Sequence, residues 1–71
     1  MEFTITSSEG YIPLIQLLKA CKVVYSGGEA QQMVTDGIVL RNGTVELRKR
    51  AKIKAGELIE IPELNVQIRT L

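Results

Sequence analysis

Apolar residues recur at two different spacings along this chain, and the change comes near Ile38. Before Ile38 they return every three or four residues, which is typical of helices with one buried face; after it they alternate with polar residues, which is typical of strands. A chain of 71 residues holds one domain. The pattern therefore predicts a single α+β domain over residues 1–71. Two helices pack on a small antiparallel sheet, in the order strand, helix, helix and β-meander.

The two helices carry recognisable start and stop signals. Pro13 suits the first turn of a helix whose apolar stripe runs from Leu14 to Cys21. Ser26-Gly27-Gly28-Glu29 has the form of a capping box, and Gly37 is placed to end the second helix in a left-handed conformation.

Strands are expected on either side of the helices. Asn42-Gly43 is the dipeptide that type I′ turns favour, so it predicts a hairpin between the alternating segments around it. The predicted strands are residues 2–6, 38–41, 44–47, 57–61 and 66–69.

Positive charge is concentrated in one short segment. Residues 41–54 carry six Lys and Arg against one Glu, a net charge of +5, whereas the segments before and after it each carry −2. This block predicts a surface for phosphates, although a solvated loop would have the same composition.

Within this block the segment from Arg48 to Lys54 is the most informative. If it is extended, one side of it carries a cationic row about 20 Å long, with Leu47, Ala51 and Ile53 on the other side. The row would consist of Arg48, Arg50, Lys52 and Lys54. A solvated edge strand protected from aggregation by its charges is the structural alternative.

Two weaker candidates lie on the helices. The Ser26-Gly27-Gly28 start offers free N–H groups and an open backbone to a phosphate, while a plain helix cap would need the same residues. Lys19 and Lys22, three residues apart, are expected on one flank of the first helix.

Several chemistries are not expected. The chain has no His and one Cys, Cys21, so we expect no metal site, no disulfide and no His-based triad, and no acidic pair has the setting of a catalytic residue. So small a chain has few residues to line a cavity, so we expect no cofactor and no small-molecule substrate. Without a membrane span or signal peptide, the protein is expected in the cytoplasm. With only three aromatic residues, structured RNA is a better partner than a single strand.

The chain resembles the RNA-binding domain of the ribosomal protein S-four type, with its alpha-L motif, and most closely a small free-standing bacterial subfamily. The matching segments are Ser26 to Ala30, Asp36-Gly37, the hairpin Ile38 to Gly43, and Glu46 to Ile53. Many members have a basic residue early in the second helix, where this chain has Gln31 and Gln32. The resemblance therefore implies that the hairpin and the cationic row carry more of the RNA contact.

Together these features predict a non-enzymatic module that docks on structured RNA, ribosomal or transfer RNA. The Ser26, Gly27 and Gly28 amides would take one phosphate, Asn42 would reach a base edge or a ribose hydroxyl, and Lys19 and Lys22 would widen the patch. The expected phosphate contacts are Arg41, Arg48, Lys49, Arg50, Lys52 and Lys54.

Two other functions remain open at this stage. A protein-interaction module would present the basic row to an acidic partner. A ubiquitin-like sulfur carrier has a similar hairpin, but such proteins end in Gly-Gly, and this chain ends Ile68-Arg69-Thr70-Leu71.

Overall fold

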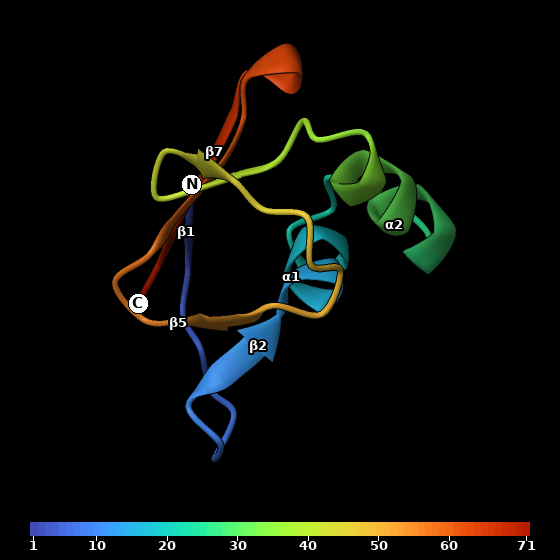
Figure 1. Ribbon diagram of the computed structural model, residues 1–71. Coiled ribbons are helices and arrows are strands. Elements are labelled where there is room, and N and C mark those ends of the chain that lie inside the picture. The colour runs from blue at the N-terminus through green and yellow to red at the C-terminus, as the bar shows by residue number, and fades with distance from the viewer.

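The computed structural model describes all residues from 1 to 71 and has an α+β architecture, as the sequence predicts. Helices α1 and α2 lie on one side of a five-stranded sheet, and β2 and β5 form a separate ribbon beside α1 (Figure 1). The elements are β1 (Glu2–Phe3), β2 (Tyr11–Pro13), α1 (Leu14–Ala20), α2 (Gly27–Thr35), β3 (Leu40–Arg41), β4 (Thr44–Val45), β5 (Lys52–Lys54), β6 (Leu58–Ile61), the 3₁₀ helix η1 (Pro62–Leu64) and β7 (Val66–Thr70).

The sheet is mixed, which corrects the prediction of a purely antiparallel one. Its strand order is β1-β7-β6-β3-β4, and β1 pairs with β7 in parallel, with Glu2 opposite Arg69. The prediction also missed the antiparallel ribbon, in which Ile12 lies opposite Ile53. Both pairings join segments that are far apart in the chain, so no local pattern reports them.

Helix α1 is shorter than predicted. Pro13 is its N-cap and ends β2, instead of standing in the first helical turn. Lys22 lies beyond the end of the helix with φ 59°, so Lys19 and Lys22 do not share a helix flank as predicted.

Helix α2 begins and ends where the sequence places it. The Ser26 hydroxyl accepts a hydrogen bond from the Glu29 amide at 3.2 Å, as in a capping box. The Glu29 carboxylate, however, accepts from the Tyr25 amide instead of the Ser26 amide. Gly37, with φ 73°, donates to the Val34 carbonyl and provides the predicted left-handed end.

The core fills the space between the helices and the sheet. It contains twelve buried apolar residues, with α1, α2, β5, β6 and β7 all contributing. They are Leu14, Leu17, Leu18, Val24, Ala30, Val34, Val39, Ala51, Ile53, Ile59, Ile61 and Ile68. Because β5 contributes Ile53 to this core, its charged neighbours in the strand are turned toward solvent.

The hairpin between β3 and β4 forms at the predicted dipeptide. Asn42 has φ 51° and Gly43 has φ 86°, as a type I′ turn requires. Across the turn, Arg41 pairs with Thr44 and Leu40 pairs with Val45.

The segment from Arg48 to Lys54 is not one extended strand, which corrects the prediction of a straight cationic row about 20 Å long. A turn at Lys49-Arg50, closed by a hydrogen bond from the Ala51 amide to the Arg48 carbonyl, precedes β5. The chain turns there because it must leave the hairpin and come back to pair with β2. Leu47, predicted to face inward, is 63% exposed.

None of the helices has the length and apolar character needed to cross a lipid bilayer.

Candidate nucleic-acid interface

The turn at Lys49-Arg50 folds the basic segment around an open hollow of about 470 Å³. Six residues line it, of which five are cationic and the sixth is Ala51. The cationic ones are Arg41, Arg48, Arg50, Lys52 and Lys54. The structure therefore arranges these side chains around a hollow, whereas the sequence predicts four of them in a straight row.

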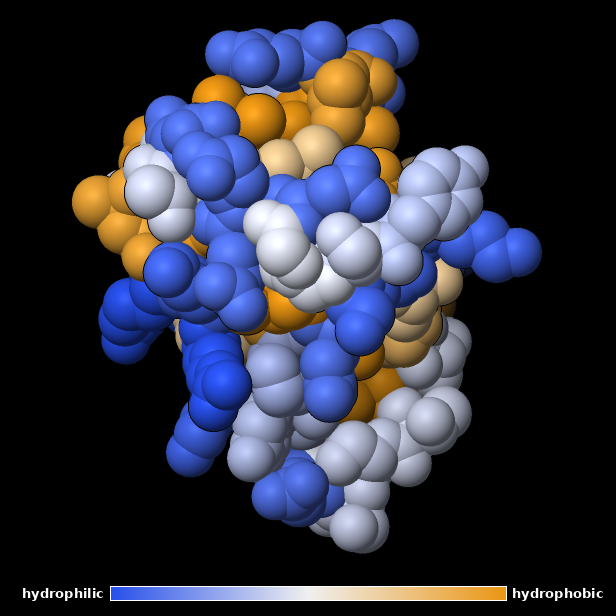
Figure 2. All heavy atoms as spheres, turned by 90° about the vertical axis from the view of Figure 1, so that its right-hand side faces the viewer, coloured by the Kyte–Doolittle hydropathy of each residue, from blue (hydrophilic) through white to orange (hydrophobic).

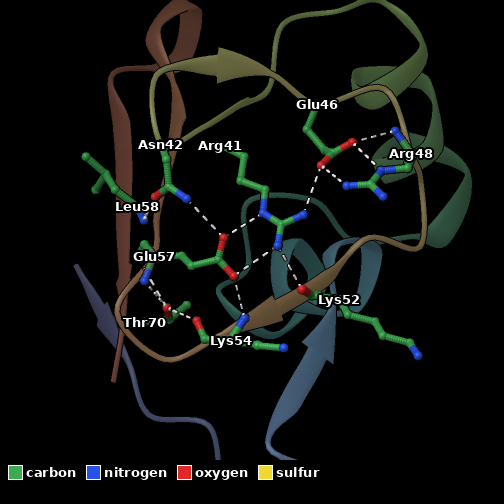
Figure 3. A network of polar contacts seen from close by, with 9 residues as sticks. All are labelled: Arg41, Asn42, Glu46, Arg48, Lys52, Lys54, Glu57, Leu58 and Thr70. Carbon is green, nitrogen blue, oxygen red and sulfur yellow. Dashed lines mark hydrogen bonds and ion pairs between the residues drawn. The ribbon is translucent and has the colours of Figure 1, made fainter.

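Arg41, which lines this hollow, is the centre of a network of hydrogen bonds and ion pairs (Figure 3). Its Nε donates to Glu57 Oε1 at 2.6 Å, and one Nη donates to Glu57 Oε2 and to the Lys52 carbonyl. The other Nη donates to Glu46 Oε1 at 3.1 Å. Four of the five N–H donors of the guanidinium are thus used inside the protein. Arg41 therefore positions the segments around it more than it offers itself to a ligand.

The two carboxylates in this network are held in their charged form. Hydrogen bonds from Arg48, helped by Arg41, lower the pKa of Glu46 to about 2. Hydrogen bonds from Arg41, with the Lys54 amide and Asn42, lower the pKa of Glu57. In return, Glu57 raises the pKa of Arg41. The network stays ionised at neutral pH.

Ion pairing divides the six cations of the basic segment into two groups. Arg41 and Arg48 pair with Glu46 and Glu57, so their charges are largely compensated. The other four form no ion pair in the structure: Lys49, Arg50, Lys52 and Lys54. In Figure 3 the Lys52 and Lys54 side chains extend away from the carboxylates. These four side chains are exposed and carry the uncompensated positive charge of residues 41–54.

A second hollow, of about 320 Å³, extends the basic surface toward the helices. It is lined by Lys19 of α1, Gln31 of α2 and Arg50, among others. Arg50 lines both hollows. Lys19, which the sequence predicts to widen the RNA-binding patch, therefore lies next to the basic segment. The face that carries α2 is largely hydrophilic, with hydrophobic atoms in separate patches (Figure 2).

Other predicted site residues are not brought into these hollows. Lys22 and the Ser26-Gly27-Gly28 start of α2 line neither of them. The amides of Gly27 and Gly28 donate no hydrogen bond within the chain, so they stay open to a ligand. Asn42 uses its side chain internally, donating to Glu57 Oε1 and accepting from the Leu58 amide.

Two acids that hold this surface together, Glu46 and Glu57, are not among the residues predicted from the sequence. Glu46 is buried, with 8% of its surface exposed. The sequence signal for its role is that it is the one acidic residue among the cations of residues 41–54. Glu57 and Arg41 are 16 residues apart, and nothing in the local sequence joins them. No cluster of three His, Cys, Asp or Glu side chains has the arrangement needed to hold a metal ion.

A sequence profile described as an S4 domain matches residues 3–69. The chain belongs to the S4 domain family. It is 36% identical over 58 residues to the Escherichia coli (strain K12) protein named "Putative RNA-binding protein YbcJ", a stretch covering 82% of this chain and 83% of that protein. The Shigella flexneri protein YbcJ, named as uncharacterized, matches to the same extent.

A solved structure extends this S4 comparison to the whole fold. The solution structure of YbcJ from E. coli, described as revealing an alpha-L motif involved in RNA binding, matches with a TM-score of 0.69. The two chains are 32% identical, and the match covers 96% of this chain and 85% of that one. The expected family and fold class are confirmed.

Proposed function

We propose that this S4 domain is a non-enzymatic module that binds structured RNA by contacting phosphates. The observation that carries the proposal is the hollow lined by five cationic side chains. Lys and Arg side chains grouped on one face supply most of the affinity of such proteins, because they replace the counterions of the phosphate backbone. The relatives named or described as RNA-binding support the same partner.

The phosphate contacts fall mainly to the four unpaired cations, with Lys19 extending the surface across Arg50. Arg48 adds a side chain that is 75% exposed although it pairs with Glu46. Arg41 has a positioning role, since four of its donors are already used. Ribosomal or transfer RNA in the cytoplasm is the proposed class of partner, because both offer folded helical segments.

The shape of the surface favours folded RNA over a free strand. A folded RNA helix holds its phosphates close together. Cations from several protein segments that line one hollow can contact such neighbouring phosphates. A single-strand binder would present a series of aromatic platforms, and this chain has three aromatic residues in all.

A competition experiment tests this proposal. A hairpin RNA and an unpaired RNA of matched length and charge compete for the protein at near-physiological salt, and we expect the hairpin to win. Equal competition would reduce the domain to a nonspecific polyanion binder. If neither RNA binds, the basic surface serves an acidic protein partner instead.

A further inference from the structure

A third hollow, of about 360 Å³, lies at the N-terminal side of the basic surface. It is lined by residues between Phe3 and Glu9, by β2 and by Gln16 of α1. Phe3, Ile5 and Ile12 give it an apolar part, and Ser7, Glu9 and Gln16 give it polar groups. Its volume is at the lower end of the range of about 300–1,000 Å³ for small-molecule sites. A combination of apolar wall and few polar groups suits a flat ligand with a polar edge.

Tyr11 and Glu9 form the ordered part of this hollow. The Tyr11 hydroxyl donates to Glu9 Oε2 at 3.1 Å. Glu9 is held in place by a turn in which its amide donates to the Ser7 hydroxyl and Gly10 donates to the Ser7 carbonyl. The second oxygen, Glu9 Oε1, accepts no hydrogen bond in the chain and remains available.

The hollow is continuous with the cationic surface. Tyr11 lies opposite Lys54 in the β2–β5 ribbon, and Lys52 Nζ is 5.1 Å from the centre of the Tyr11 ring. Pro13 and Gln16 line both this hollow and the one that contains Lys19 and Arg50. A nucleotide whose phosphate is held by Lys52 or Lys54 therefore has its base within reach of Tyr11.

We propose that this hollow binds one unpaired base of the RNA, with the base packed on Tyr11 and its Watson–Crick edge on Glu9. This inference rests on the proposed function and adds a point of base selection to a surface that otherwise contacts phosphates. Asn42, which the sequence offered for base contact, has its side chain occupied by Glu57 and Leu58.

The carboxylate determines which base fits. A carboxylate only accepts hydrogen bonds, and it repels phosphate, so Glu9 selects a base edge that donates. Guanine presents two adjacent donors, the N1–H and the exocyclic amino group; one matches the free Glu9 Oε1, and the other matches the second lone pair of Oε2, which also accepts from Tyr11. Uracil presents one N–H between two carbonyl oxygens, which the carboxylate repels. The hollow selects guanine over uracil.

Hairpin RNAs that differ at one bulged nucleotide test the inference. We expect a bulged G to bind more tightly than a bulged U and than the hairpin without a bulge. Tyr11→Ala should lower affinity for the bulged-G hairpin by roughly 5- to 20-fold, as expected for loss of base stacking on an aromatic ring. It should leave the affinity for the bulge-free hairpin unchanged. Tyr11→Phe, which keeps the ring, should retain most of the gain.

Glu9→Gln tests the base selection separately, at an exposed position, and the Gln side chain keeps an amide oxygen that can accept from the Tyr11 hydroxyl. It should equalise the affinities for bulged G and bulged U. Glu63→Gln is the matched control, because it makes the same change of net charge outside the hollow; the preference for G should survive it.

The outcomes separate this inference from the proposed function. If the bulge-free hairpin binds but the identity of the bulged base has no effect, or if Tyr11→Ala keeps the full affinity for the bulged-G hairpin, the base site is wrong and phosphate binding stands. If no hairpin binds, both proposals fail.

Discussion

Arg41 Nε and Glu57 Oε1 are 2.6 Å apart, and a second guanidinium nitrogen reaches Glu57 Oε2 at 3.1 Å. This two-point pair connects the end of β3 to the turn before β6. The same guanidinium also contacts Glu46, just after β4, and the Lys52 carbonyl in β5, so one side chain links β3 to both of these segments. The shape of the cationic hollow therefore depends on Arg41.

Arg41→Gln should lower the free energy of unfolding by about 2–3 kcal/mol, because Glu57 loses its only charged donor and Glu46 and the Lys52 carbonyl each lose one hydrogen bond. Urea unfolding measures the change. Arg69→Gln is the control, since Arg69 is exposed and forms no ion pair; it should change stability by less than about 0.5 kcal/mol. Equal stability of the two variants would contradict a central role for Arg41.

Acid should destabilise the fold between about pH 5 and pH 2. The pKa of Glu46 falls from 4.5 to about 2 in the folded protein, and that of Glu57 also falls. A carboxyl with a depressed folded pKa contributes stability that is complete above its ordinary pKa and is lost as the pH drops toward the folded value. Unfolding free energies measured across this range should decline, and Glu46→Gln should flatten the decline. A constant stability of the unmodified protein down to about pH 3 would refute this linkage.

Asn42→Gly should separate a structural role from a base contact. Glycine accepts the positive φ of 51° at this position, so the change removes only the hydrogen bonds to Glu57 and Leu58. We expect a loss of about 1–2 kcal/mol in stability. Because the side chain is occupied, affinity of the folded protein for hairpin RNA should stay within about twofold. A tenfold loss of affinity in a fully folded variant would restore the base contact that the sequence predicts.

Gly28→Ala tests the start of α2. The added methyl meets only Ser26 Oγ, at 3.9 Å, so stability should rise by about 0.5 kcal/mol. If the free Gly27 and Gly28 amides hold a phosphate, the methyl should obstruct it, and RNA affinity should fall several-fold. Ser26→Ala serves as the comparison, because it should cost about 1 kcal/mol of stability through the lost cap. Full RNA affinity of Gly28→Ala would leave Ser26-Gly27-Gly28 as a helix cap alone.

The predictions that proved correct rest on local chemistry. The capping hydrogen bond at Ser26, the left-handed end at Gly37 and the positive φ angles of Asn42-Gly43 each depend on a few neighbouring residues. Such signals are readable in sequence because a single side chain or a missing Cβ determines them.

The features that the sequence did not predict depend on distant pairing. The turn at Lys49-Arg50 exists because β5 pairs with β2, whose residues lie about forty positions earlier. The parallel pairing of β1 with β7 joins the two ends of the chain in the same way. Likewise, the compensation of Arg41 by Glu57 appears only when the β3 end and the turn before β6 are placed together. Counting charges along the chain therefore overestimated how many cations are free.

The salt dependence of RNA binding tests the central claim most directly. Four unpaired cations predict that the logarithm of the affinity for a hairpin RNA falls against log salt with a slope of roughly 3 to 4. Replacing Arg50, Lys52 and Lys54 together with Gln should reduce the slope by about 2 to 3, whereas Arg69→Gln should leave it unchanged. An undiminished slope in the triple variant would show that this hollow does not bind the phosphates.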